Sequence, residues 1–131
     1  MIRDDFGPGN TVPDTIAAES LVRHLFDVVD GRRWEGLAEV FAEHAVYERP
    51  GYEPLVGLGR ISRFYTHERI IASGSHEVDH VTEGLETAAC WGRFRGESVS
   101  GDPLDEQFAD TYVLVDGKIT RRKTFFYRPA I

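Results

Sequence analysis

The second half of the chain contains four successive runs in which hydrophobic and polar residues alternate. A period of two is typical of strands that bury one face. The dipeptide Asp116-Gly117 separates the last two runs and is a strong β-hairpin signal. The pattern therefore predicts an antiparallel meander of four strands, at about residues 77–83, 87–97, 107–115 and 118–127.

The first half of the chain has helical periodicity instead. Hydrophobic residues recur at helical spacing and form one stripe that would face a core: Ile16, Leu21, Leu25, Phe26 and Val29. Gly31 is a suitable stop for this first helix. Three helices are expected, at about residues 14–31, capped by Asp14 or Thr15, at about 34–42 and at about 57–68.

Three helices followed by a meander indicate an α+β fold. A further strand, about 44–49, lies between the second and third helices and ends at Pro50-Gly51. A strongly curved sheet that wraps over helices leaves an open cone, which is a natural pocket for a small molecule. Residues 1–12 are rich in Gly, Pro and Asp and are expected to be a flexible arm, with 13–131 as one domain.

Composition narrows the classes of partner. The chain has 131 residues and a net charge of −7, which argues against nucleic acid or an anionic membrane surface as a partner. It has one cysteine, Cys90, so no internal disulfide can form. There is no apolar run of membrane-spanning length and no apolar signal region. A cytoplasmic location is expected.

The sequence resembles the NTF2-like, cystatin-like fold of ketosteroid isomerases and SnoaL-like polyketide cyclases. The resemblance is carried by "VVDGRRWEGLAEVFAEHAVYERPGYEPLVGLGRISRFY" and by "FADTYVLVDGKI", and it extends over about residues 14–127. It implies a cone of three N-terminal helices packed on a strongly curved mixed or antiparallel sheet. The reaction is less constrained, because this fold hosts isomerases, cyclases, dehydratases, epoxide hydrolases and non-catalytic domains.

The resemblance also implies positions for catalytic groups, and several of them are changed here. The isomerases' general-base aspartate, before a proline at the end of the first strand, corresponds to Arg49, which stays protonated and cannot be a base. Their oxyanion-hole tyrosine corresponds to Leu25. Their second oxyanion-hole group, a carboxylic acid, corresponds to Asp110, and a supporting tyrosine corresponds to Tyr65. The aspartate that SnoaL-like cyclases carry on the last strand corresponds to Thr124.

Strand alternation predicts which side chains share the pocket. A buried arginine is costly unless it is paired, so Asp110 is expected to pair with Arg49 or Arg122 and to be ionised. Such a pair would polarise an oxygen-bearing substrate, with Asp110 as acid/base, or it would be a structural ion pair only. The pocket-facing residues are expected to be Tyr47, Arg49, Phe108, Asp110, Tyr112, Arg122, Thr124 and Phe126.

The segment "HEVDH", residues 76–80, matches the H-E-x-x-H pattern of zinc proteases. That chemistry needs a helix, so that both histidines reach one metal ion. The surrounding Val78, Val81 and alternation favour a strand, in which His76 and His80 would be roughly 13 Å apart. We expect no metal site, and His76, Val78 and His80 are expected on one face of the strand. A single histidine there could still contact a ligand as a proton shuttle.

Other candidates have ordinary structural explanations. His24 neighbours the position of the missing tyrosine and could reach the pocket, although an exposed histidine is the simpler interpretation. Trp91 and Phe94 are more typical of a core than of a ligand platform. Cys90 has no histidine at a recognisable spacing, so thiol chemistry has little support.

Two hypotheses remain from the sequence. In the first, the protein is a cofactor-independent enzyme of isomerase, cyclase or dehydratase type that acts on a hydrophobic, oxygenated, polyketide-like molecule. In the second, it is a non-catalytic binding or scaffold domain. The first hypothesis assigns catalysis to Asp110, Arg49 and Arg122, and substrate binding to Tyr47, Tyr65, Phe108, Thr124, Phe126 and His24.

The outer face of the predicted sheet is expected to form a homodimer. A single sheet with helices on one face leaves its convex face open. Alternate residues there, including Val113, Val115, Phe125 and Tyr127, are apolar and favour burial against a second copy.

Overall fold

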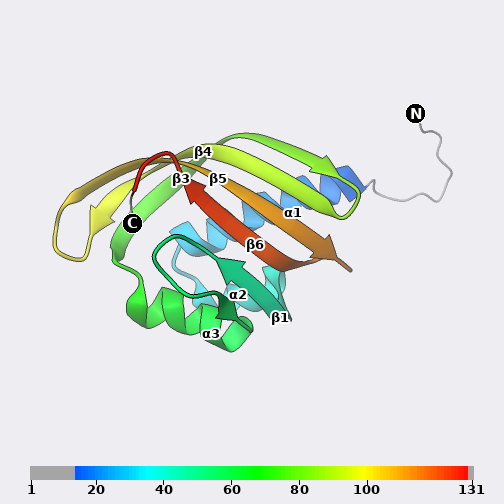
Figure 1. Cartoon of the computed structure of the whole chain (residues 1–131), viewed down its shortest axis with the longest axis horizontal. Coiled ribbons are helices and arrows are strands. Elements are labelled where there is room, and N and C mark those ends of the chain that lie inside the picture. The colour runs from blue at the N-terminus through cyan, green and yellow to red at the C-terminus, as the bar shows by residue number, and fades with distance from the viewer. Residues whose placement is uncertain (1–13, 130–131) are drawn as a thin grey trace, which may run out of the picture.

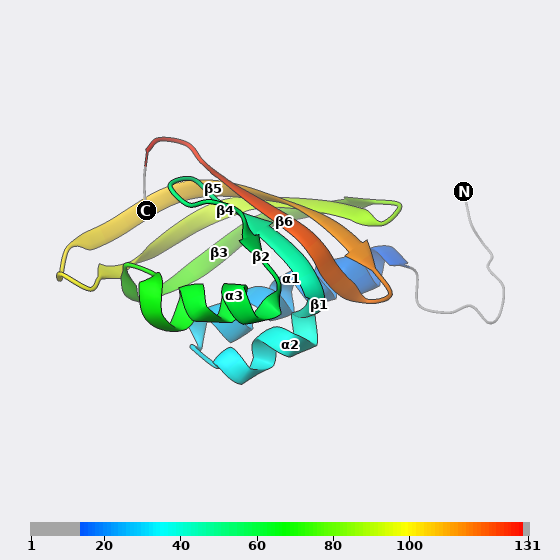
Figure 2. The same ribbon diagram turned by 60° about the horizontal axis from the view of Figure 1, so that its bottom comes forward.

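The computed structural model describes residues 14–129, and the expected arm at 1–12 lies outside the described residues. Figure 1 shows long curved strands, and Figure 2 shows the helices gathered beneath one face of the sheet. This arrangement confirms the α+β cone.

In chain order the elements are α1 (Asp14–Asp30), the 3-10 turn η1 (Trp34–Gly36), α2 (Leu37–Val40), β1 (Phe41–Glu48), β2 (Leu55–Val56), α3 (Leu58–Arg63), the π-helical turn η2 (Phe64–Glu68), β3 (Ile71–Gly84), β4 (Thr87–Ser98), β5 (Pro103–Val115) and β6 (Lys118–Phe126).

Helix α1 follows most of the apolar stripe that the sequence predicts. Leu25, Phe26 and Val29 are buried as predicted, whereas Leu21 is only partly buried and Val22, which the stripe left out, is fully buried. The helix ends at Asp30. Arg32 then takes a left-handed conformation with φ of 55°, which turns the chain towards η1. The proposed caps Asp14 and Thr15 have side chains outside the described residues.

The second helix is shorter than predicted. Its last residue is Val40, and Phe41 already belongs to β1, where it pairs with Ile119 of β6. The expectation that the helix extends to Ala42 is wrong, because Phe41 and Ala42 are part of strand β1, which pairs with β6. The short strand β2, which pairs with β1, was not predicted. The third helix is confirmed, since α3 and η2 together cover 58–68.

The sheet has the order β2-β1-β6-β5-β4-β3, in which β1 and β6 are parallel and all other neighbours are antiparallel. Strand β3 begins at Ile71 rather than near Glu77, because Gly74 continues the strand instead of breaking it. A side chain at Gly74 would collide with the ring of Phe94 on β4, so glycine is needed for this close approach. Strand β5 likewise begins early, at Pro103.

A β-bulge between Val78 and His80 changes the faces of β3. A one-residue shift in register moves every later side chain to the other face. His76 therefore lies towards the helices, whereas His80 is exposed and stacks on Trp91 with ring centroids 4.9 Å apart. The expectation that His76, Val78 and His80 share one face is wrong, and Trp91, at 45% exposure, is not a core residue.

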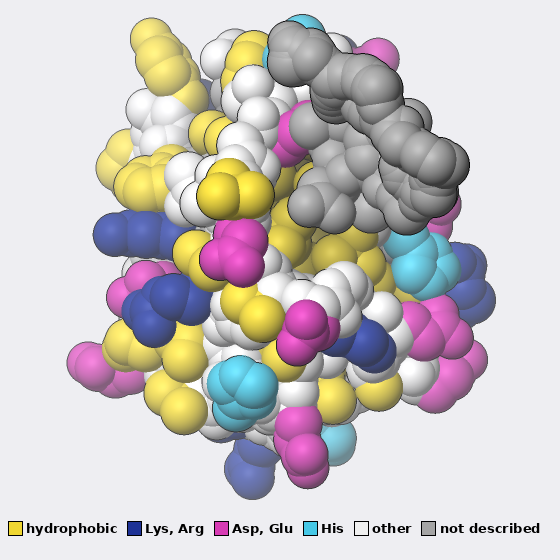
Figure 3. Space-filling model, turned by 90° about the vertical axis from the view of Figure 1, so that its right-hand side faces the viewer, with side chains coloured by type: hydrophobic (Ala, Val, Ile, Leu, Met, Phe, Trp, Pro, Cys, Tyr) yellow, Lys and Arg dark blue, Asp and Glu magenta, His cyan; other side chains and the backbone are white. Residues whose placement is uncertain are grey.

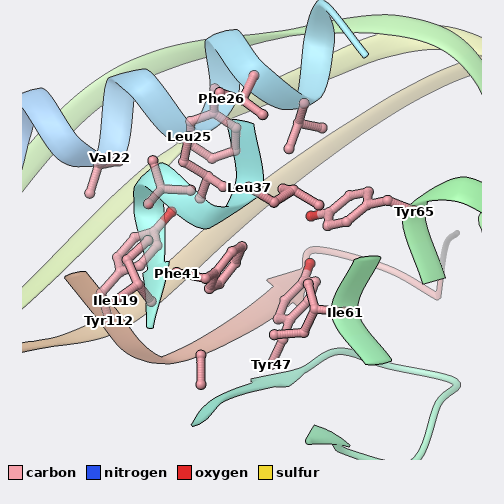
Figure 4. Packing of buried hydrophobic residues seen from close by; sticks show 14 of the residues in the cluster. Val22, Leu25, Phe26, Leu37, Phe41, Tyr47, Ile61, Tyr65, Tyr112 and Ile119 are labelled. Atoms are coloured by element: carbon pink, nitrogen blue, oxygen red, sulfur yellow. The ribbon is translucent and has the colours of Figure 1, made fainter. Parts of the chain in front are cut away.

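The core lies between the helices and the concave face of the sheet. Figure 4 shows side chains of α1, α2, β1, α3, η2, β5 and β6 converging there. Burial of each large apolar side chain contributes about 1.5–3 kcal/mol, so this layer holds the helices to the sheet. Residues labelled in that view are Val22, Leu25, Phe26, Leu37, Phe41, Tyr47, Ile61, Tyr65, Tyr112 and Ile119. Among the described residues, no helix is long and apolar enough to cross a membrane.

Candidate active site

A small internal cavity of about 20 Å³ lies inside the cone. A volume of this size is enough for about one water molecule. Of the nine residues to which the sequence assigns catalysis or substrate binding, eight line this cavity and His24 does not. Tyr112, which was also expected to face the pocket, is not part of the lining. The lining consists of Val29, Tyr47, Arg49, Tyr65, Arg69, Ile71, His76, Phe94, Phe108, Asp110, Arg122, Thr124 and Phe126.

Asp110 and Arg122 form a buried ion pair in this lining. The distance from Arg122 Nη2 to Asp110 Oδ2 is 2.9 Å, and Arg122 Nε donates to the same oxygen at 3.0 Å. Asp110 is 0% exposed and Arg122 is 4% exposed. Burial disfavours the charged guanidinium, but the Asp110 carboxylate together with the surrounding tyrosine hydroxyls more than offsets this effect and holds the pKa of Arg122 well above its ordinary value. Of the two arginines considered as partners, Arg122 is therefore the one that pairs with Asp110.

The remaining hydrogen bonds of Asp110 also come from protein groups. Thr124 Oγ1 donates to Oδ1 at 2.6 Å, and the Tyr112 hydroxyl donates to Oδ2 at 2.7 Å. Burial, and then the Asp110 charge, raise the pKa of Tyr112 well above its usual range, so this hydroxyl keeps its proton. Both oxygens of Asp110 act as acceptors, as those of an ionised carboxylate do.

Tyr47 continues the network towards Arg49. Its hydroxyl lies 3.0 Å from Thr124 Oγ1, whose single proton is already donated to Asp110, so Tyr47 must be the donor. Arg49 Nη1 donates to the Tyr47 hydroxyl at 3.1 Å. Burial opposes ionisation of Tyr47, but Arg122 and Arg49 together lower its pKa below the ordinary value. The hydrogen bonds thus run from Arg49 through Tyr47 and Thr124 to Asp110.

Arg49 lies among aromatic rings. Its guanidinium carbon is 4.9 Å from the ring centroid of Phe64, 5.6 Å from Phe126, 5.8 Å from Tyr52 and 5.9 Å from Tyr47. These contacts are within the range of cation–π attraction. They hold a permanent positive charge beside the cavity.

Tyr65 presents a second hydroxyl to the cavity. It accepts a hydrogen bond from Arg122 Nη1 at 2.8 Å, which leaves its own proton for another acceptor. Burial raises the pKa of Tyr65, so the hydroxyl remains protonated. The Trp34 ring stacks on Tyr65 with centroids 5.3 Å apart and fixes its orientation.

Arg69 is a third arginine of the lining that the sequence patterns did not indicate. It is the first residue after η2, in a connection where no hydrophobic periodicity indicates which way a side chain faces. Its guanidinium lies over the Tyr65 ring at 5.3 Å, and its buried Nε has no hydrogen-bond partner among the described residues. Burial lowers the pKa of Arg69. Among the described lining residues three arginines therefore face a single carboxylate, that of Asp110, in a chain whose overall charge is −7.

His24 lies apart from this site. Its Nε2 is 2.8 Å from Glu39 Oε1, and its side chain is 42% exposed. It borders a separate cleft of about 660 Å³ at the end of the molecule where α1 begins. Figure 3 views this end, where hydrophobic, acidic and histidine side chains are mixed. His24 is thus not brought together with the other eight residues.

The geometry of the described residues does not support nucleophilic chemistry at Cys90 or a metal site at the H-E-x-x-H segment. Cys90 is fully buried, and burial together with the Asp110 charge raises the pKa of its thiol to about 11, which disfavours the nucleophilic thiolate. Within residues 14–129, no group of three or more His, Cys, Asp or Glu side chains converges as metal ligands would. His76 and His80 of the H-E-x-x-H segment lie on a strand and on opposite faces.

Comparison with known proteins identifies the family. The family model for the SnoaL-like domain matches residues 22–122. The chain belongs to the SnoaL-like family. No curated protein matches the sequence closely enough to count as a relative.

Solved structures with the same fold are distant in sequence from this SnoaL-like chain. A candidate SnoaL-like polyketide cyclase from Jannaschia sp. CCS1 has a TM-score of 0.78 at 16% identity, covering 92% of both chains. A candidate ketosteroid isomerase from Kribbella flavida DSM 17836 has a TM-score of 0.72 at 24% identity, over 90% of this chain and 85% of the other. TerC, co-crystallised with polyporic acid, has a TM-score of 0.76 at 17% identity, over 84% and 91%.

Proposed function

We propose that this protein is a cofactor-independent enzyme of isomerase, cyclase or dehydratase type that acts on a small, hydrophobic, oxygenated molecule. The observation that carries the proposal is the convergence of Arg49, Arg69 and Arg122 on one cavity that also contains the Tyr65 hydroxyl. Fixed cations and hydroxyl donors in a water-poor site stabilise negative charge that develops on a substrate oxygen. An enolate or a carboxylate of a polyketide-like molecule has such an oxygen.

The roles within the site follow from the hydrogen bonds. Asp110 is fully buried and both of its oxygens are occupied, so we assign it a positioning role rather than direct acid/base chemistry. It fixes the guanidinium of Arg122, which in turn orients Tyr65. Arg49 and Arg69 are less buried and are proposed to contact the substrate.

The size of the cavity limits how a ligand enters. A molecule with a ring needs more room than about 20 Å³, so binding must displace side chains of the lining. Arg49, Arg69 and Phe126 are half-buried, and their flexible or rotatable side chains are the ones proposed to move. The apolar walls Phe94 and Phe108 would then contact the hydrocarbon part of the ligand.

The alternative function is a binding or scaffold domain without chemistry. The observation that favours it is that the polar network is complete around Asp110. The resemblance also implies that Leu25 and Thr124 occupy positions at which related enzymes carry catalytic groups. An Asp110→Asn variant distinguishes the two, because an enzyme should lose turnover of its substrate whereas a binding domain should largely retain its ligand. The co-crystallisation of TerC with an acid lends support to an acidic ligand under either function.

A titration with two matched probes tests the proposed anion preference. Benzoate and benzyl alcohol share a ring and differ in charge. We expect benzoate to bind at least about tenfold more tightly, a difference of about 1.4 kcal/mol. Arg69→Met should remove most of this preference, whereas Arg93→Met, at an exposed arginine that binds Asp105, should not. Equal affinity for the two probes would contradict the proposal.

We further propose a homodimer packed through the convex face of the sheet. Strand register aligns Trp91, Ala109 and Phe125 in a row across β4, β5 and β6. Trp91 and Phe125 are 45% and 44% exposed, respectively. A second copy would remove this apolar row from water. The single buried Cys90 is compatible with the reducing cytoplasmic location that we also propose.

A further inference from the structure

His76 and Asp30 form a hydrogen-bonded pair at the wall of the cavity. His76 Nδ1 lies 2.6 Å from Asp30 Oδ1, and the backbone N–H of His76 donates to Asp30 Oδ2 at 2.8 Å. Their side chains are 12% and 21% exposed. Asp30 is the last residue of α1 and His76 lies on β3, so the pair joins a helix end to the sheet.

The orientation of the imidazole is fixed from several sides. Its ring centroid is 4.4 Å from Phe26, 4.7 Å from Phe94 and 5.3 Å from Phe108. Because a carboxylate accepts hydrogen bonds, Nδ1 carries the ring proton and donates it to Asp30. Nε2 is then the unprotonated nitrogen, and His76 is part of the cavity lining.

We propose that His76 is the general base of this site and that Asp30 is its positioning residue. The inference deepens the proposed function and rests on it, because a base is useful only if a substrate enters the cavity. It also separates the two halves of the chemistry: the arginines and Tyr65 hold the substrate oxygen, and His76 moves the proton. Nothing in the resemblance to isomerases or cyclases assigns a base to this position on β3.

The proton transfer balances without a co-reactant. His76 Nε2 takes a proton from the carbon next to a substrate carbonyl, so that the C–H bond breaks and an N–H bond forms. The electron pair moves into a new C=C bond, and the carbonyl oxygen becomes an enolate that Arg122, Arg69 and Tyr65 are placed to stabilise. The imidazolium then returns its proton to a carbon or to a leaving hydroxyl group, which restores neutral His76.

The surrounding charges agree with a neutral imidazole at rest. Burial lowers the pKa of His76, and Asp30 only partly opposes this effect. The other charged groups that act on the ring are Arg122 on β6, which lowers its pKa, and Asp110 on β5, which raises it. A base that is unprotonated at neutral pH is ready to accept a proton.

A measurement on the free protein tests this assignment without any substrate. Nitrogen-15 NMR of the histidine rings at neutral pH should show His76 as the tautomer with a proton on Nδ1 and none on Nε2. Asp30→Asn should lower its pKa further, because the charge that favours the imidazolium is removed. A charged ring at neutral pH, or a proton on Nε2, would overturn the inference whether or not the cavity binds a ligand.

A carbon-acid probe tests the chemistry. We expect the protein to accelerate deuterium exchange at the carbons next to the carbonyl of cyclopentanone in D₂O. His76→Asn keeps a donor towards Asp30 but has no basic nitrogen, and it should reduce the enzymatic exchange by about tenfold or more. His80→Asn, on the same strand but on the outer face, is the matched control and should leave exchange unchanged.

The pH profile separates a base from a structural histidine. The rate of exchange by the wild type should fall as the pH is lowered and His76 becomes protonated. Asp30→Asn should move this fall in rate to lower pH. If cyclopentanone shifts the NMR signals of the cavity but exchange is absent or survives in His76→Asn, the base assignment is overturned while ligand binding stands. Failure of both cyclopentanone and benzoate to perturb the cavity would instead contradict the proposed function, and the tautomer measurement would still decide on His76.

Discussion

Arg122 reaches Asp110 diagonally across two antiparallel strands. Register pairs Asp110 with Thr124 and Tyr112 with Arg122, so the 2.9 Å contact from Nη2 to Oδ2 joins residues that are not directly opposite. All four side chains lie on the concave face and are buried. This diagonal pair places one guanidinium between Asp110 and Tyr65, and it is the centre of the polar network.

Loss of the arginine of this pair should strongly destabilise the fold. Arg122→Met leaves the buried Asp110 carboxylate without its cation, and we expect the free energy of unfolding to fall by about 3 kcal/mol or more. Arg93→Met removes an exposed arginine of an ion pair with Asp105 and should cost less than about 1 kcal/mol. Urea denaturation of both variants checks the contrast. Similar small losses in both would show that the pair contributes little to stability.

Thr124 should matter for its hydroxyl rather than for its shape. Thr124→Val keeps the volume but removes the donor to Asp110 and the acceptor for Tyr47, so a loss of about 1–3 kcal/mol in unfolding free energy is expected. Thr111→Val, one residue from Asp110 and exposed on the outer face, is the matched control. An equal response of the two variants would argue against the chain of hydrogen bonds.

The depressed pKa of His76 predicts a specific acid sensitivity. Burial holds this pKa below its ordinary value of 6.5, so the unfolded chain binds more protons between the two values. The contribution of neutral His76 to stability is therefore complete above about pH 6.5 and falls as the pH drops towards the folded pKa. The difference in unfolding free energy between wild type and His76→Asn should shrink as the pH is lowered from about 7.5 to 5. A difference that stays constant would refute the prediction.

Cys90 should be unreactive in the native protein. Its thiol is buried, and its pKa of about 11 leaves almost no thiolate at neutral pH. Iodoacetamide should label it slowly in buffer and rapidly after unfolding in guanidinium chloride, as mass spectrometry would report. Rapid labelling of the folded chain would show that the region around Tyr112 opens to solvent.

The proposed dimer should depend on the outer row of aromatic residues. Phe125→Asp places a charge in the apolar row formed by Trp91, Ala109 and Phe125, and it should shift the protein from dimer to monomer in analytical ultracentrifugation. Leu85→Asp, at a residue that is 85% exposed in the turn between β3 and β4, serves as the control and should not change the mass. A wild type that is monomeric at tens of micromolar would contradict the dimer.

Sequence periodicity predicted the site best where strands alternate without interruption. Along β5 and β6 it correctly placed Asp110, Arg122 and Thr124 on the inner face. It did not predict the bulge after Val78, because a single extra residue leaves no clear mark in the pattern, and so it put His80 on the wrong face.

Other parts of the site depend on contacts between distant segments. In the sequence, Asp30 is recognisable only as the end of a helix. Its hydrogen bond to His76 joins residues 46 positions apart, and no local pattern predicts such a contact. Arg69 lies between η2 and β3, outside the helical and strand periodicities from which inward-facing residues can be predicted. The resemblance indicated the pocket but could not select between Arg49 and Arg122 as the partner of Asp110, since both were predicted to face inwards. Their side-chain contacts settle that choice.

The most direct test of the account is a crystal structure of the protein with benzoate. We predict that the carboxylate lies in the central cavity, within hydrogen-bond distance of Arg69 or Tyr65, with its ring between Phe126 and Phe108 and its edge towards His76. Benzoate bound only in the 660 Å³ cleft beside His24, with the central cavity unchanged, would contradict a positively charged substrate site inside the cone.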